Sequence, residues 1–353
     1  MAATSVIKIL DSVIRSQAVT RSLGKIKLWR DEDGSVLYYV GNSIVLFKIR
    51  HQGEWKAMRC YTRNVPRLAE IYNGKYLAEE LYVYSGSKSG VWIDVVLEDW
   101  VDGTTLRKCT ERAIENNDTA TLTTLANRFD SLACELLHSD WSHGDLTAEN
   151  ILVTPELQLR LIDFDCKFMP QFAGQHSSEL GTASYQPPSR KLHDFDKDID
   201  DYSIALISTA LRALTISPEI YHKYGFYDGL IFSPALIERG RCCALDEVKR
   251  MFLSRNMGVA YRVAMLLEKG TLRIAHLRNI FSCTDKFRGA ELQLFMKHGF
   301  VGYTTMNGDV VIPPIYDDGL SFKDNIAKVK LESKWIGINP QNEVVEEPKR
   351  KKR

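Results

Sequence analysis

The sequence has no long apolar run, no leader pattern at its start and no excess of one charge. Its apolar stretches stay well short of the roughly 20 residues that a membrane-spanning helix needs. Lys and Arg total 46 against 45 Asp and Glu, so the net charge is only +1. A balance of this kind gives no global field toward nucleic acid or an anionic membrane. We therefore expect a soluble cytoplasmic protein that binds neither nucleic acid nor membrane.

Cysteine spacings typical of zinc sites are also missing. No two of the seven cysteines are separated by two residues, and the only neighbours are Cys242 and Cys243. An odd number of cysteines, mostly inside apolar stretches, is typical of free thiols in a reducing compartment. The composition, 44% hydrophobic and 26% charged over 353 residues, is ordinary for a globular chain and excludes disorder throughout.

The first 103 residues are dominated by β-forming stretches separated by turn residues such as Gly41-Asn42-Ser43. Such a pattern predicts an antiparallel meander, here preceded by an amphipathic helix. The expected elements are a helix over 5–17, strands over 36–40, 44–49 and 55–61, a helix over 66–79, and strands over 81–84 and 91–98. Tryptophans 29, 55, 92 and 100 lie at strand ends, where we interpret them as core aromatics and not as a base-stacking platform.

The middle of the chain is mostly helical. Apolar residues recur at helical spacing between positions 122 and 137, which predicts a helix buried along one side. Two short apolar runs at 151–153 and 159–162 predict a hairpin, and further helical segments extend to about residue 281. This part is therefore expected to be helix-rich.

Acidic and amide residues gather on both sides of the predicted hairpin. His143-Gly144-Asp145 and Asn150 precede it, and Asp163-Phe164-Asp165 follows it, so that intervals of five and thirteen residues separate Asp145, Asn150 and Asp163. This pattern resembles the eukaryotic-like protein kinase superfamily. The resemblance implies that Asp145 is the catalytic base beside the acceptor hydroxyl. It also implies that Asn150 and Asp163 hold Mg²⁺ on ATP, since hard oxygen ligands suit this ion.

The resemblance covers about residues 30 to 280 and implies an α+β fold of two lobes, a small β-rich N-lobe and a helical C-lobe. The expected divisions are an N-terminal helical extension over 1–29, a kinase-like domain over 30–284 with lobes of 30–103 and 104–284, a β segment over 285–346 and a basic disordered tail over 347–353. In this frame, 181–188 resembles the end of an activation segment. Asp200 begins a buried helix and is implied to brace the catalytic loop.

Nucleotide-binding positions are implied by the same resemblance. Residues 95–103 resemble the strand and hinge that bind adenine, with Leu97 as gatekeeper. Arg59 shares a strand face with Ala57 and takes the place of the family's phosphate-binding Lys, while Glu70 is either its ion-pair partner or an exposed helix residue. The implied cofactor-binding residues are Gly41, Ala57, Arg59, Glu70, Leu97, Glu98, Trp100, Asn150 and Asp163.

Several departures from the family pattern keep other functions open. Arg59 replaces a Lys, Gly41 is what remains of the Gly-rich loop, and Asp165 replaces the Gly that lets the segment flip. The leading interpretation is a protein Ser/Thr kinase with weak activity. The alternatives are a nucleotide-binding pseudokinase scaffold and a small-molecule phosphotransferase resembling aminoglycoside and choline kinases. The Gly-Thr-x-x-Tyr segment from Gly181 favours a protein acceptor.

The last segment repeats itself. Residues 299–303 (GFVGY) are echoed by residues 334–338 (KWIGI), with Phe300 and Trp335 separated by 35 positions. The segment resembles about one and a half WG repeats, short hairpins that commonly act as binding or capping modules. Its alternatives are a site for a protein or ligand partner and a simple β appendage.

Overall fold

The computed structural model describes residues 4–15, 18–86, 89–226, 228–255, 257–274, 277–281, 289–306, 308, 310–323, 325–331, 333–340, 342 and 344–345. The expected basic tail lies outside these residues. The chain is of mixed α+β type and divides into two compact units. Unit 1 runs to Gly103 and also takes in Asp163–Lys167, and unit 2 comprises Thr104–Ile162 and the chain from Phe168 onward.

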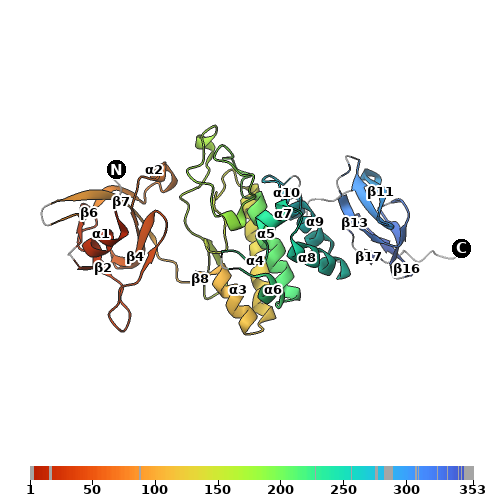
Figure 1. The fold of residues 1–353 in the computed structure, drawn as a ribbon, viewed down its shortest axis with the longest axis horizontal. Coiled ribbons are helices and arrows are strands. Elements are labelled where there is room, and N and C mark those ends of the chain that lie inside the picture. Colours follow the sequence, from red (N-terminus) through yellow and green to blue (C-terminus); the bar gives the residue numbers. More distant parts are fainter. Residues whose placement is uncertain are drawn as a thin grey trace. The chain divides into compact units, whose positions relative to one another are not determined.

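Unit 1 is built on a seven-stranded sheet (Figure 1). Its strands are β1 Val19–Thr20, β2 Lys27–Leu28, β3 Tyr38–Val40, β4 Ile44–His51, β5 Glu54–Tyr61, β6 Tyr76–Tyr84 and β7 Gly90–Asp99. The order is β1-β6-β7-β5-β4-β2, with β3 paired to β4, and the neighbouring pairs are antiparallel. The predicted meander of β3, β4 and β5 is thus confirmed.

One face of this sheet is covered by the N-terminal segment, α1 Val6–Leu10 and the π-helical turn Asp11–Arg15. The side chain of Ser5 caps α1 by accepting a hydrogen bond from the N–H of Lys8. Ile9 and Val13 are buried against apolar residues of β4 and β5. The hydrophobic face of the predicted leading helix therefore forms part of the core of unit 1.

Two expectations for unit 1 are wrong. The helix expected over 66–79 is a single turn, α2 Leu68–Ile71, and β6 already begins at Tyr76. The turn is cut short because Arg67 and Gly74 adopt left-handed φ values of 65° and 75° at its two ends. The region 1–29 also contributes β1 and β2 to the sheet, although only a helix was expected there.

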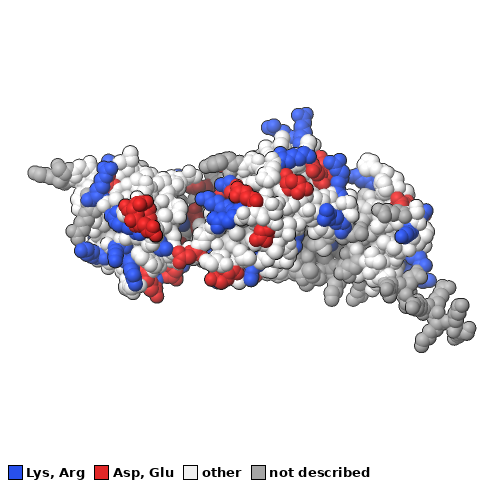
Figure 2. Space-filling model, turned by 90° about the horizontal axis from the view of Figure 1, so that it is seen from below, with Lys and Arg blue, Asp and Glu red and all other residues white. Residues whose placement is uncertain are grey.

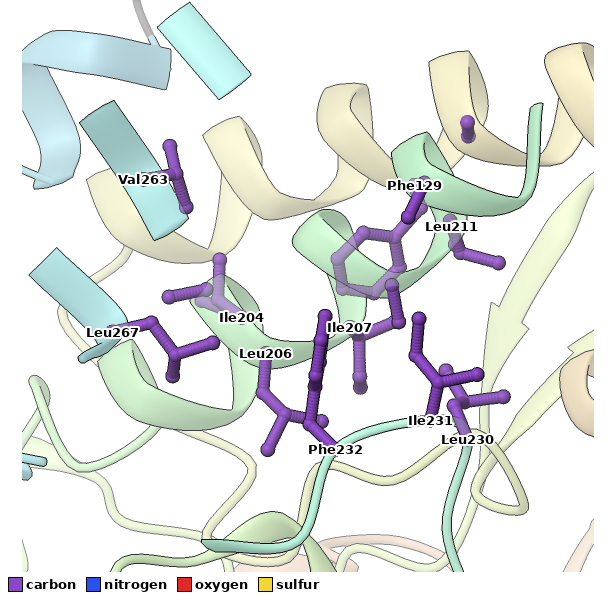
Figure 3. Close-up of a cluster of buried hydrophobic side chains, with 14 of the residues drawn as sticks. Phe129, Ile204, Leu206, Ile207, Leu211, Leu230, Ile231, Phe232, Val263 and Leu267 are labelled. Carbon is purple, nitrogen blue, oxygen red and sulfur yellow. The ribbon is translucent and has the colours of Figure 1, made fainter. Parts of the chain in front are cut away.

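Unit 2 contains the helices α3 Leu106–Glu115, α4 Thr119–His138, α5 Asp201–Ile216, α6 Ile220–Tyr224, α7 Pro234–Glu238, α8 Cys243–Ser254, α9 Gly258–Leu267 and α10 Leu277–Phe281. The expected hairpin is present as β9 Ile151–Val153 and β10 Leu159–Leu161, with β8 Thr104–Thr105 on the other edge of β9. In the core, Phe129 of α4 lies against Ile207 and Leu211 of α5 (Figure 3). The prediction of a buried helix around 122–137 is confirmed.

The C-terminal segment forms two small antiparallel sheets (Figure 1). The first contains β11 Leu292–Lys297, β12 Phe300–Thr305 and β13 Val310–Tyr316, and the second contains β14 Asp318–Gly319, β15 Ala327–Leu331, β16 Lys334–Ile338 and β17 Val344–Val345. His298 and Gly299 both have positive φ, as a two-residue hairpin turn between β11 and β12 requires. The two residues at equivalent repeat positions, Phe300 and Trp335, are exposed.

Among the residues that the structure describes, none of the helices combines the length and apolar character needed to cross a bilayer. On the face of the molecule in Figure 2, acidic and basic side chains are interspersed, in keeping with the balanced composition.

Candidate functional site

The loop between α4 and β9 brings two of the predicted residues together within unit 2. The amide Nδ2 of Asn150 donates to the carbonyl oxygen of Asp145 at 2.8 Å and lies 3.4 Å from its carboxylate Oδ2. Both side chains are half-buried. These bonds use the amide nitrogen of Asn150, so its oxygen Oδ1 is the atom left to act as a cation ligand. Asp145 and Asn150 thus form one preorganised pair.

The residue that precedes α5 holds this loop in place through hydrogen bonds. Asp200, buried at 3% exposure, accepts hydrogen bonds from the N–H of His143 at 2.5 Å and of Gly144 at 3.0 Å. Gly144 has a φ of 82°, which a residue with a side chain rarely adopts. Burial raises the pKa of Asp200, against the opposing influence of His143 and these N–H groups. The expectation that Asp200 braces the loop is confirmed by these contacts.

The carboxylate of Asp145 is also bound from the segment that follows residue 180. The N–H of Thr182 donates to Oδ1 at 2.6 Å, and its hydroxyl donates to Oδ2 at 3.3 Å. The preceding Gly181 has a φ of 74°, and a Cβ placed there would lie 3.0 Å from Asp145 Oδ1 and 3.0 Å from Arg190 Nη1. Glycine is therefore required at 181 for this close approach, and Asp145 is oriented by donors on both oxygens.

The neighbour of Asp200 gives a prediction about stability. Burial raises the pKa of Asp201 to about 7; the N–H of Ile274, which donates to its Oδ2 at 2.9 Å, opposes the rise, and Asp198 and Asp200 add to it. The folded state therefore keeps this proton to higher pH than the unfolded chain, whose Asp titrates near 3.8. The resulting stabilisation is complete below about pH 4 and is lost as the pH rises to about 7.

Asp201→Asn is therefore expected to leave the free energy of unfolding nearly unchanged at pH 4 and to raise it by roughly 3 to 4 kcal/mol at pH 8. Urea unfolding of the variant and the wild type across this pH range measures the difference. An equal effect at both ends would show that Asp201 titrates normally.

In unit 1, Arg59 and Asp163 are brought together. The guanidinium Nη2 of Arg59 makes a short ion pair with Oδ1 of Asp163 and lies 3.3 Å from Oδ1 of Asp165. Arg59 is buried at 4% exposure, and Asp163 has a φ of 66°. A left-handed φ at a residue other than glycine costs of order 1–3 kcal/mol, so the surrounding contacts must hold Asp163 in this conformation. The candidate phosphate-binding cation and the candidate metal ligand therefore form one partly buried ion pair.

Two tyrosines that the sequence analysis did not single out complete this cluster. The hydroxyls of Tyr61 and Tyr72 donate to Oδ1 of Asp165 at 3.0 and 2.8 Å, and Tyr72 also accepts the N–H of Phe164 at 3.0 Å. Burial raises the pKa of both tyrosines, so their hydroxyls stay protonated and able to donate. Burial likewise raises the pKa of Asp165, while Arg59 lowers it.

The expected partner of Arg59 is not Glu70. Glu70 is exposed in the single turn of α2, and the carboxylates paired with Arg59 are those of Asp163 and Asp165. The reason is that α2 is a single turn that ends before Gly74, so the longer helix on which this pairing was expected does not form. The alternative interpretation of Glu70, as an exposed helix residue, agrees with its position.

The strand register determines on which face of the sheet Leu97, the predicted gatekeeper, lies. The opposed residues of β5 and β7 are Ala57 and Glu98, Met58 and Leu97, and Arg59 and Val96. Since directly opposed residues share a face, Leu97 lies on the face away from Arg59 and packs into the core under α1. Val96 lies on the face of Arg59, fully buried in the same cluster as Tyr61 and Tyr72. The face that carries Ala57, Arg59 and Glu98 therefore presents Val96 and not Leu97.

The end of β7 is anchored by a lysine among three tryptophans. The Nζ of Lys48 lies 4.7 Å from the ring centre of Trp100, 5.5 Å from that of Trp55 and 5.6 Å from that of Trp29, and 3.2 Å from Oδ1 of Asp102. The N–H of Trp100 donates to the Trp55 carbonyl at 3.1 Å. This backbone N–H is thus already used within unit 1.

Gly41 and Glu98, the remaining predicted positions, have local partners. The N–H of Gly41 donates to the Ile44 carbonyl at 3.0 Å and closes the turn between β3 and β4. The carboxylate of Glu98 lies 3.2 Å from Nζ of Lys75. Neither contact involves Arg59 or Asp163. Gly41 therefore has the geometry of a hairpin turn.

No cluster of three or more His, Cys, Asp or Glu suited to a metal ion occurs in the described part of the chain. Mg²⁺ is commonly held by one or two protein oxygens together with phosphate oxygens and water. Asp163 in unit 1, whose side chain is 38% exposed, has carboxylate oxygens of the kind that Mg²⁺ prefers. In unit 2, the amide oxygen of Asn150 has the same donor chemistry.

Comparison with known proteins identifies the C-terminal segment. Residues 302–335, from β12 to β16, match the family described as a WG containing repeat. The predicted WG-repeat segment is confirmed by this match. The chain has no match among curated proteins.

Proposed function

We propose that the chain is a protein kinase-like phosphotransferase that uses ATP and Mg²⁺ and transfers the γ-phosphoryl group to a Ser or Thr hydroxyl of a protein. The ion pair between Arg59 and Asp163 carries this proposal, because it joins a buried cation to a carboxylate 104 positions away in the chain. The paired Asp145 and Asn150, braced by Asp200, support it from unit 2. Unit 1 then serves as the N-lobe and the helices of unit 2 as the C-lobe.

In this reaction Asp145 accepts the proton of the acceptor hydroxyl as its oxygen attacks the γ-phosphorus. The new O–P bond forms while the bond between the γ-phosphorus and the β,γ-bridging oxygen breaks, and ADP leaves. Arg59 binds phosphate oxygens through its guanidinium, which remains charged at any working pH. Asp163 and Asn150 would hold Mg²⁺, which neutralises phosphate charge when bound.

The acceptor is proposed to be a protein because of the segment around Gly181 and Thr182. This segment binds the carboxylate of Asp145 directly, through the N–H and hydroxyl of Thr182. A loop anchored on the catalytic residue offers a platform on which an extended polypeptide can lie. A small-molecule acceptor of the aminoglycoside or choline type needs no such platform and is the less favoured alternative.

A second candidate function is a nucleotide-binding scaffold without turnover. The observation that favours it is the direct contact between Arg59 and Asp163, which engages the proposed metal ligand with a protein cation. Arginine is also a wide planar group, unlike the compact ammonium of lysine. Both candidates require nucleotide binding, so only a turnover measurement separates them.

Arg59→Lys distinguishes the two candidates. Purified wild type and variant are incubated with γ-labelled ATP and Mg²⁺, and label transferred to protein is measured. If the chain is an active enzyme, the wild type transfers label. Arg59→Lys is then expected to change the rate of transfer by up to about tenfold in either direction, because lysine keeps the charge but lacks the planar guanidinium. Label in neither protein, with nucleotide binding intact in both, would favour the scaffold and contradict the phosphotransferase.

A further inference from the structure

Asp165 has no part in the proposed reaction, yet its carboxylate accepts several hydrogen bonds. Its Oδ1 atom accepts from Tyr61 at 3.0 Å, from Tyr72 at 2.8 Å and from Arg59 Nη2 at 3.3 Å. The side chain is 17% exposed, and each donor comes from the sheet or from the segment just after α2. A half-buried carboxylate held by three converging donors has a fixed position, unlike an acid on the surface.

The two carboxylates that share Arg59 have different access to solvent. Asp163 is 38% exposed, whereas Asp165 is 17% exposed, and both contact the same guanidinium nitrogen. A cation arriving from solvent therefore reaches Asp163 first. Arg59 is confined by burial at 4% exposure, so it stays within reach of both carboxylates. Arg59 and an incoming cation thus compete for Asp163, whereas Asp165 remains paired with Arg59.

We infer that Asp165 is a positioning residue that holds the Arg59 guanidinium when Asp163 takes up its metal ion. This inference rests on the proposed function. Leaving a buried guanidinium without a carboxylate partner is costly, so Asp163 is released more easily when a second carboxylate, that of Asp165, remains beside Arg59. Asp165 fills the role that the sequence pattern gave to Glu70, which is exposed in α2.

The tyrosines make this arrangement rigid. Tyr72 donates to Asp165 and accepts from the N–H of Phe164 at 3.0 Å, so a single hydroxyl fixes both the backbone and the side chain of this segment. Tyr61 contacts both members of the pair, since it donates to Asp165 and lies 3.4 Å from Nε of Arg59. The position of the Asp165 carboxylate is therefore set independently of Asp163.

Direct metal binding tests the inference without an activity assay. Mn²⁺ is titrated into the full chain with the non-hydrolysable analogue AMP-PNP, and bound Mn²⁺ is measured by electron paramagnetic resonance. Asp165→Asn is expected to raise the half-saturating Mn²⁺ concentration about tenfold, because Arg59 is then neutralised by Asp163 alone. Glu70→Gln, the matched control on the exposed carboxylate, is expected to bind Mn²⁺ like wild type.

A double variant separates competition from structural damage. Combining Arg59→Met with Asp165→Asn removes the competing cation. At AMP-PNP concentrations that saturate each variant, the half-saturating Mn²⁺ concentration is therefore expected to return to within about threefold of wild type. If Asp165 had only a structural role, the double variant would bind Mn²⁺ as weakly as Asp165→Asn does. That result, or unchanged Mn²⁺ binding in Asp165→Asn, would overturn the inference.

Two further outcomes are distinguishable. Should Asp165→Asn fail to fold by circular dichroism, Tyr61→Phe combined with Tyr72→Phe removes two donors and keeps every charge. It is expected to shift Mn²⁺ binding in the same direction, and no shift would overturn the inference. Absence of Mn²⁺ and nucleotide binding in wild type would instead contradict the proposed function itself.

Discussion

Asp163→Ala is expected to reduce phosphoryl transfer by at least about 10³-fold, the scale associated with loss of a group that stabilises transition-state charge. The change removes the proposed metal ligand and one of the two carboxylates paired with Arg59. Because Asp165 remains to pair with Arg59, the fold is expected to survive. Transfer of label from γ-labelled ATP to the chain itself and to a mixed protein acceptor measures the loss.

The control for this variant is Glu70→Ala, which removes an exposed carboxylate from the same unit and is expected to keep wild-type transfer. Circular dichroism of both variants verifies that unit 1 remains folded. Transfer by Asp163→Ala at a rate close to that of wild type would show that phosphoryl transfer does not depend on this carboxylate.

Asp145→Asn is expected to lower kcat by about 10² to 10⁴-fold, the range for loss of a general base, with the KM for ATP changed little. Asn keeps the side-chain shape and can still accept from the N–H of Thr182, so the loop is expected to hold its position. What it loses is the capacity to take up the proton of the acceptor hydroxyl. Steady-state kinetics with varied ATP separate the two parameters.

Asp140→Asn is a suitable control, because Asp140 is an exposed acid at the other end of the same loop. It is expected to leave kcat and KM unchanged. An Asp145→Asn variant with normal kcat would remove Asp145 from the chemistry. An equal loss in Asp140→Asn would trace the effect to a general disturbance of the loop.

Elements with a strong local pattern could be predicted from the sequence. The meander of β3, β4 and β5 follows from alternating β-formers and turn residues, and α4 from apolar residues at helical spacing. The hairpin of β9 and β10 and the C-terminal repeat were predictable for the same reason. In each case the residues that decide the structure are neighbours in the chain.

Elements decided by distant partners could not be predicted. The two-residue strands β1 and β2 exist because they pair with β6 and β4, and two residues carry no periodicity. The length of α2 depends on the left-handed residues Arg67 and Gly74, of which only the glycine gives a sequence signal. The face of Leu97 depends on the register of β7 against β5, and a shift of one residue reverses it.

The candidate site likewise contains residues that the sequence predicts and residues that it does not. Asp145, Asn150 and Asp163 were found because a motif places them at fixed intervals. Asp165 was noted only as an unusual residue, and Tyr61 and Tyr72 look like ordinary core aromatics in the sequence. Their roles follow from hydrogen bonds that span more than 90 positions, for which a single sequence carries no signal.

Thermal unfolding with and without ATP and Mg²⁺ tests nucleotide binding, the central claim, most directly. A ligand that binds only the folded state stabilises it by about 2.7 kcal/mol at one hundred times its Kd. We expect the midpoint to rise by several degrees with ATP and Mg²⁺ together, and by less with ATP alone. An unchanged midpoint under both conditions, at millimolar nucleotide, would contradict a nucleotide site built on Arg59 and Asp163.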